Sequence, residues 1–161
     1  MLPEAVAKAL SDVKTAVERY SFLAILERMA WEPFVKVKEK IEPQKEVVAV
    51  DFSGAGFLNY VFVRVDNPDV IAQLDLHADG RVELAVTPRE LYEMGYTQSI
   101  GGFRVLKYSP SQSDYVIEFA PGMLNTFGVP FRGKCRLTLK NPTTATATYT
   151  LYAWVIRVKE V

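Results

Sequence analysis

The first thirty residues carry apolar side chains at intervals of three and four positions. These positions are Leu2, Val6, Leu10, Val13, Val17, Tyr20 and Ala24. Their period is close to 3.5 residues, which is typical of the seam of a coiled coil or a helix bundle. Pro3 suits a first helical turn, whereas Pro33 disfavours a helical backbone at Glu32. The pattern predicts one long amphipathic helix over residues 3–32, with a broader apolar face from Phe22 to Trp31.

After Pro33 the pattern changes to the alternation of apolar and polar residues that is typical of strands. In the first of these segments we expect Val35, Val37 and Ile41 on one side of the strand, and the lysines on the other. The expected strands are 34–41, 45–52, 57–65, 70–76, 81–87, 103–109, 114–119, 131–140 and 146–159.

Residues that favour turns separate these segments. The expected turns are 53–56, 66–69, 78–80, 110–111 and 141–142. One short helix is expected after Thr87, because Thr87-Pro88-Arg89-Glu90 is a capping-box pattern and Gly95 can close the helix. Helices do not alternate with the strands, which argues against a parallel sheet. The sequence therefore predicts a mainly β fold, an antiparallel β-sandwich or jelly roll over residues 34–161, preceded by a helical appendage over residues 1–33.

The last strand is apolar on both of its faces, so both faces need a cover. One face carries Tyr149, Leu151 and Ala153, and the other carries Tyr152, Trp154 and Ile156. The front helix or a neighbouring subunit could supply the second cover. We therefore expect an oligomer interface made of Val6, Leu10, Val13, Val17, Tyr20, Tyr152, Trp154 and Ile156.

Composition narrows the classes of function. Lys and Arg number 19, and Asp and Glu also number 19, so no global field draws the chain onto nucleic acid. No run of eighteen apolar residues predicts a membrane span, and the start shows no secretory pattern, so a virion or cytoplasmic location is expected. The scarcity of Asn and Gln beside Lys and Glu favours a thermophilic source.

No motif in the chain specifies an active site. Residues 75–80 resemble the start of a calcium loop, but the twelfth position is Val86 instead of a carboxylate, so a hairpin is expected. Gly54-Ala55-Gly56 lacks the further residues of a phosphate-binding loop and is expected to be a hairpin turn. Cys135 and His77 occur once each and suggest neither a common zinc set nor a triad, and Cys135 is expected to be buried. We assign no catalytic, cofactor-binding or metal-binding residue.

Lysines 36, 38 and 40 could bind phosphates, but lysines on an edge strand also prevent edge-to-edge aggregation, and we favour that interpretation.

The closing segments resemble those of structural proteins from tailed phages and archaeal viruses. The resemblance covers residues 100–161 and lies in the run 131–134, the run 136–141, the stretch 146–152 and a final strand that reaches the chain end. It implies a β-sandwich or jelly roll that assembles as a symmetric oligomer, with itself and other virion proteins as partners.

These observations predict a non-enzymatic structural protein that forms a homo-oligomer, as a capsid, decoration or tail component. The alternative is a module that binds carbohydrate or another small ligand through exposed aromatic residues. A third alternative is an enzyme that uses carboxylates without a motif.

Overall fold

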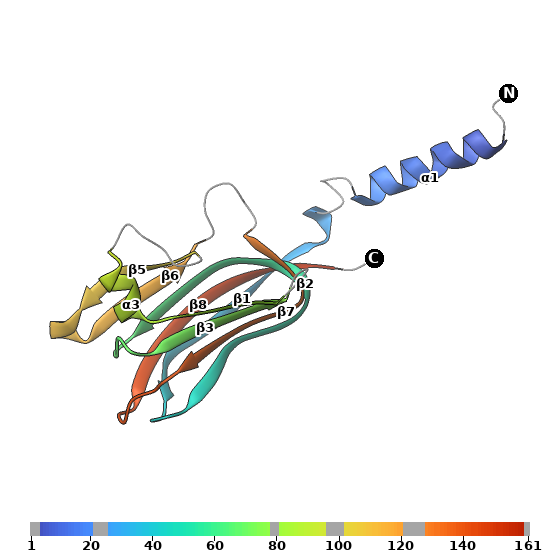
Figure 1. The fold of residues 1–161 in the computed structure, drawn as a ribbon. Coiled ribbons are helices and arrows are strands. Elements are labelled where there is room, and N and C mark those ends of the chain that lie inside the picture. The colour runs from blue at the N-terminus through green and yellow to red at the C-terminus, as the bar shows by residue number, and fades with distance from the viewer. Residues whose placement is uncertain (1–3, 21–25, 78–80, 96–101, 121–127, 160–161) are drawn as a thin grey trace.

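The computed structural model describes residues 4–20, 26–77, 81–95, 102–120 and 128–159. The protein is mainly β, with an antiparallel sheet and a helix at its N-terminal end (Figure 1). The helical elements are α1 (Glu4–Tyr20), α3 (Pro88–Glu93) and the 3-10 turn η1 (Pro110–Gln112). The strands are β1 (Met29–Ile41), β2 (Glu46–Val65), β3 (Ile71–His77), β4 (Arg81–Val86), β5 (Phe103–Ser109), β6 (Asp114–Phe119), β7 (Val129–Lys140) and β8 (Ala147–Val158).

Strand β2 belongs to both halves of the sheet. Its first part, up to Leu58, pairs with β7, which leads on to β3 and β4. Its second part, from Gly56 to Val65, pairs with β8 on one side, and residues 61–65 pair with β6 on the other. One half of the sheet therefore has the order β1-β8-β2-β6-β5, and the other has the order β2-β7-β3-β4.

One hydrophobic cluster takes its side chains from both halves of the sheet. Leu137 and Leu74 come from β7 and β3, while Val63, Leu151 and Phe119 come from β2, β8 and β6. Alternate residues along each strand supply this cluster, as the two-residue period requires. The core therefore lies on one face of the half-sheet that contains β1 and β8, and leaves the opposite face for other contacts.

Most of the expected strands are confirmed to within a few residues, and so is the short helix. Thr87 Oγ1 accepts a hydrogen bond from Glu90 N at 3.1 Å, and Glu90 Oε2 accepts one from Thr87 N at 2.9 Å. Asn141 is buried in its turn and donates to the Ala145 carbonyl at 2.7 Å. These elements are predictable because they depend on side chains that lie only a few residues apart in the sequence.

The turn expected at residues 53–56 is wrong, because these residues lie inside the continuous strand β2. Gly54 has a φ of 131°, and Gly56 pairs with Phe131 of β7 and Arg157 of β8. A Cβ on Gly56 would lie 2.3 Å from the Ile156 carbonyl oxygen. Here glycine permits close approach of backbones instead of reversing the chain.

The helix expected over residues 3–32 ends too late. Helix α1 covers Glu4–Tyr20, residues 21–25 lie outside the described part, residues 26–27 are helical as expected, and β1 already begins at Met29. Pro33 does not end a helix; it lies within β1 opposite Trp154 of β8. A proline is tolerated there because β1 is an edge strand in the observed strand order. Residues 29–33 therefore belong to the sheet and not to the expected helix, and we call the part of the chain from Met29 onward the β domain.

The expected facing of β1 is wrong for two of its three apolar residues. Ile41 is buried, but Val35 and Val37 are exposed. The register shifts between Lys36 and Glu39, and Lys38 has a φ of 52°. A bulge adds one residue, and one residue is enough to exchange the two faces of a strand.

Helix α1 extends away from the sheet, as Figure 1 shows, on the side of the molecule where β1 begins. No helix in the described ranges is long and apolar enough to cross a membrane.

Candidate interaction surfaces

The apolar residues of α1 form a narrow exposed stripe. Val6, Leu10, Val13 and Val17 are 41–62% exposed, and we call these four residues the α1 seam. Their spacing of four, three and four residues places them on one side of the helix. Tyr20 ends α1, but its side chain lies outside the described part. The seam has the expected pattern, and four apolar side chains on it are open to solvent.

A second apolar surface lies on the outer face of β1, β8 and β2. It consists of Trp31, Val35, Tyr60, Phe62, Tyr152 and Trp154, which we call the aromatic strip. Trp31 is 59% exposed and Trp154 is 39% exposed.

Strand register brings the members of the strip together. Val35 lies opposite Tyr152, and Tyr152 lies opposite Phe62 on the next strand. The rings of Trp31 and Trp154 meet edge to face, with centroids 6.3 Å apart and planes at 80°. The rings of Phe62 and Tyr152 lie 5.9 Å apart. Residues from three strands therefore form one continuous apolar surface.

The strip and the expected oligomer interface share Tyr152 and Trp154 but differ at other residues. Tyr152 and Trp154 are exposed on it, whereas Ile156 is 1% exposed and is not available to a partner. Trp31, Val35, Tyr60 and Phe62 were missed, because their outward direction depends on pairing between β1, β8 and β2. The alternation of Trp31, Pro33 and Val35 was the sequence signal that could have identified part of the strip.

A hollow of about 390 Å³ opens beside the strip. It is lined by Trp31, Asn59, Tyr60 and Trp154. Tyr60 donates a hydrogen bond to Glu118 Oε2 at 2.7 Å, and burial together with this carboxylate raises the pKa of Tyr60 to about 12. The hollow therefore combines two indole side chains with a tyrosine that stays neutral at physiological pH.

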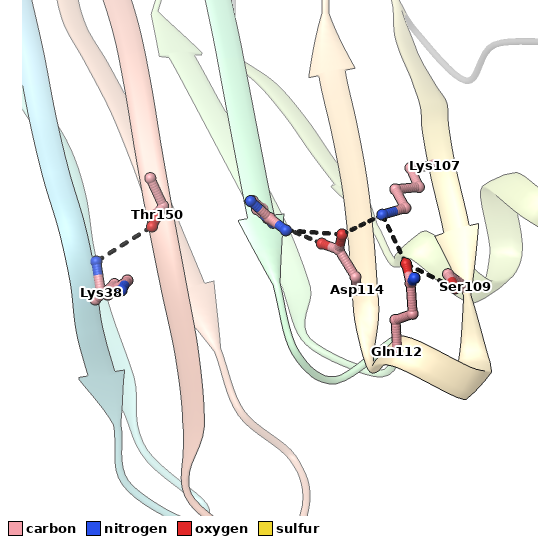
Figure 2. A network of polar contacts seen from close by, with 7 residues as sticks. Lys38, Lys107, Ser109, Gln112, Asp114 and Thr150 are labelled. Carbon is pink, nitrogen blue, oxygen red and sulfur yellow. Dashed lines mark hydrogen bonds and ion pairs between the residues drawn. The ribbon is translucent and has the colours of Figure 1, made fainter.

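Ion pairs lie next to the strip on β2, β5 and β6. Asp114 accepts hydrogen bonds from Arg64 Nε at 2.6 Å and from Lys107 Nζ, and Glu118 accepts from Arg104. In Figure 2, the Lys107 ammonium group donates hydrogen bonds to both Asp114 and Gln112. The backbone N–H of Lys38 donates to Thr150 Oγ1 on the neighbouring strand, at 3.2 Å. The two cations lower the pKa of the Asp114 carboxyl below its usual range.

The buried carboxylates of β6 each accept hydrogen bonds from cationic side chains. Asp114 and Glu118 are four residues apart on one strand, which separates their backbones by about 13 Å. By comparison, the two catalytic carboxyl groups of a glycoside hydrolase lie within about 10 Å of each other. Asp114 and Glu118 are bound instead to cationic side chains of neighbouring strands, so their geometry favours a structural role.

The single cysteine, Cys135 on β7, and the single histidine, His77 on β3, lie on neighbouring strands. Cys135 is 0% exposed, and burial raises the pKa of its thiol to about 12, with Asp51 adding to the effect. The expected burial of Cys135 is confirmed. His77 ends β3, and its Nε2 lies 3.2 Å from Asp75 Oδ1.

The residues of the calcium-like pattern take part in a hairpin. Strands β3 and β4 pair from Ala72 with Val86 to His77 with Arg81, and residues 78–80 lie outside the described part. Asp75 accepts hydrogen bonds from Arg81, which lower the pKa of its carboxyl. No group of three or more His, Cys, Asp or Glu suited to a metal occurs within the described ranges.

The lysine row lies on the exposed edge strand. Lys36, Lys38 and Lys40 are exposed on β1, where the bulge at Lys38 interrupts the regular hydrogen-bonding edge. Lysines and a bulge are two devices that hinder pairing with a further strand. This position supports the interpretation that they guard the edge.

Models of known protein families give no match to this chain, and curated proteins include no match to its sequence.

Proposed function

We propose that this chain is a non-enzymatic structural protein that assembles as a homo-oligomer, with a β-sandwich as its body. The observation that carries this proposal is the presence of two exposed apolar surfaces, the α1 seam and the aromatic strip. Burying a Val or Leu side chain contributes about 1.5–3 kcal/mol. Large apolar patches on soluble proteins commonly mark contact sites. The resemblance of residues 100–161 to viral structural proteins supports a role as a capsid, decoration or tail component.

A solution mass under native conditions tests the proposal. We expect light scattering to give a mass that is a multiple of 18.1 kDa, the mass of one chain. The double variant Leu10→Glu, Val17→Glu places two charges in the α1 seam and should give a smaller assembly, while the β-sheet circular dichroism is retained.

The matched control is Ser11→Glu with Thr15→Glu. It adds the same two charges to α1 on the side away from the seam, so the mass should not change. If the unmodified protein is a monomer at high concentration, or if both double variants have the same effect on mass, the proposed assembly is wrong.

A second candidate function is the binding of a carbohydrate or another small ligand. The hollow lined by Trp31, Asn59, Tyr60 and Trp154 favours it, because an indole face can stack on the apolar face of a sugar ring. Because the two indole planes meet at 80°, one flat sugar ring could stack on Trp31 or on Trp154, but not on both. Assembly accounts for both exposed surfaces, whereas ligand binding accounts for the strip alone.

Tryptophan fluorescence separates the two functions, because Trp31 and Trp154 are the two tryptophans of the chain and both line the hollow. Ligand binding predicts a saturable change on titration with soluble gluco- or manno-oligosaccharides, lost in Trp154→Ala. Assembly predicts a change on dilution, without any added sugar, and no saturable response to these oligosaccharides.

A further inference from the structure

We infer that the α1 helices of three or four copies associate in parallel, and that the α1 seam is the core of this bundle. The inference rests on the proposed homo-oligomer and names its partner and its geometry. The occupant of the exposed seam is the same seam of other copies of this chain.

The spacing of the seam fits a helix as its partner better than a sheet. Val6, Leu10, Val13 and Val17 follow the alternation of four and three residues that defines the two core positions of a heptad. Successive residues turn by about 100° in a helix, so these four side chains fall within about 60° of one another. A helix that docks on a sheet normally presents an apolar face of 100° or more. The seam is therefore narrow enough for a coiled coil.

The types of residue at the core positions favour more than two helices. Three residues separate position a from position d, so Leu10 and Val17 occupy a, and Val6 and Val13 occupy d. Two-stranded coils favour Leu at d, whereas a β-branched residue at d with Leu at a shifts preference to trimers and tetramers. Both described d positions hold valine.

The residues that flank the seam allow several helices to approach. Ala9 and Ala16 precede the a positions, and Ala7 and Lys14 follow the d positions. Flanking positions become partly covered when a third or fourth helix is added, and alanine is small enough for that contact. In a parallel arrangement Lys14 lies beside Ala9 of the next helix, so no like charges meet.

The second exposed surface favours the parallel direction. The aromatic strip begins at Trp31, eleven residues after the end of α1 at Tyr20. Parallel helices bring all β domains to the same end of the bundle, where the strips of neighbouring copies can be covered within the same assembly. Antiparallel helices separate the β domains and leave the strips exposed.

Helix α1 is too short to form a stable bundle as an isolated peptide. Its 17 residues span about 25 Å, and isolated helices of this length are marginal in water. The experiment therefore uses the full-length protein.

Cysteine cross-linking distinguishes the arrangements, because Cys135 is buried in the β domain, whereas cysteines placed in the seam would lie next to those of neighbouring copies. Val6→Cys and Val17→Cys are prepared separately and treated with a short bismaleimide, alone and after mixing and re-equilibration. Parallel helices place each residue beside its own counterpart, so each variant alone should give covalent dimers on a denaturing gel. Antiparallel helices place Val6 of one copy beside Val17 of the next and separate like positions by about 16 Å, so the mixture alone should cross-link.

Thr15→Cys, on the opposite side of α1, is the matched control and should not cross-link. The native mass should be three or four times 18.1 kDa. Cross-links in each variant alone together with that mass support the inference. A dimeric mass, or cross-links confined to the mixture, overturns the inference and leaves the proposed homo-oligomer standing, whereas a monomeric mass overturns both.

Discussion

At the scale of single residues, the most buried polar or reactive groups are held in neutral or paired forms. Cys135 lies in the core between apolar side chains, and Asp114 lies between two cations. Neither residue combines exposure with the activated state that a nucleophile or a general acid requires. Both are better understood as contributors to stability, and two predictions follow from their surroundings.

Cys135→Ala should lower the free energy of unfolding by about 1 kcal/mol or slightly more, because it removes a buried sulfur and leaves a small cavity. Chemical denaturation measures this loss. The raised pKa of about 12 also predicts that a thiol reagent at pH 8 does not label the folded protein. Rapid labelling before unfolding would contradict the burial of Cys135.

Asp114→Asn should flatten the acid side of the stability profile. The folded pKa of Asp114 is lowered, so its carboxylate stabilises the fold fully above the unfolded pKa of about 3.9, and this stabilisation is lost as the pH falls through the folded value. Wild type should therefore be more stable than the variant at neutral pH, and the difference should shrink between pH 4 and pH 2. Thermal melts across this range measure it.

The control for that experiment is Asp12→Asn, which removes an exposed carboxyl from α1 outside the β domain. It should leave the pH profile of the β-domain melt unchanged. Equal shifts in the two variants would argue against a specific role for the contacts of Asp114 with Arg64 and Lys107.

At the scale of elements, β2 is the strand on which the architecture depends. It connects both halves of the sheet, and Gly56 lies where β2 pairs with β7 and β8 at the same time. Continuity through this position, instead of a turn, keeps the two halves in one hydrogen-bonded sheet.

Gly56→Ala should destabilise the protein by more than about 2 kcal/mol, because the added methyl group would clash with the Ile156 backbone at 2.3 Å. Gly95→Ala is the comparison. Its Cβ meets nothing within 4 Å, but its φ is 96°, so we expect a loss of about 1 kcal/mol from backbone strain alone. Equal losses would show that β2 can move away from β8 at no cost.

At the scale of the whole molecule, the described chain has one hydrophobic core but apolar surface in two further places. The core accounts for the β domain, and the exposed α1 seam and aromatic strip are covered by other copies in the proposed assembly. The stability of the protein should then depend on its association, and therefore on its concentration.

Melting of α1 should depend on protein concentration. A structure that gains stability from association melts at a higher temperature when the concentration rises, by mass action. The helical circular dichroism signal should therefore decrease on dilution, while the β-sheet signal persists until the core unfolds. Leu10→Glu with Val17→Glu should abolish this dependence, and a helical signal that is independent of concentration in wild type would count against assembly through α1.

Local chemistry made much of the β domain predictable. The capping box at Thr87, the turn at Asn141 and the positions of most strands follow from side chains that act within a few residues of themselves. The α1 seam was predictable for the same reason, because heptad spacing can be recognised from residues three and four positions apart. By itself, the sequence determined most of the strands and which face of the first helix is apolar.

Contacts between distant segments decided the rest. The apolar run near Trp31 is a strand because β8 is there to pair with it, and that pairing prevailed over a helical pattern that continued to residue 32. The same pairing brought Trp31 beside Trp154 and built the aromatic strip. One extra residue at Lys38 exchanged the faces of β1, so Val35 is exposed and Ile41 is buried. A bulge and a strand partner far along the chain leave little trace in a local pattern, because only the folded sheet fixes register and decides which face meets the core.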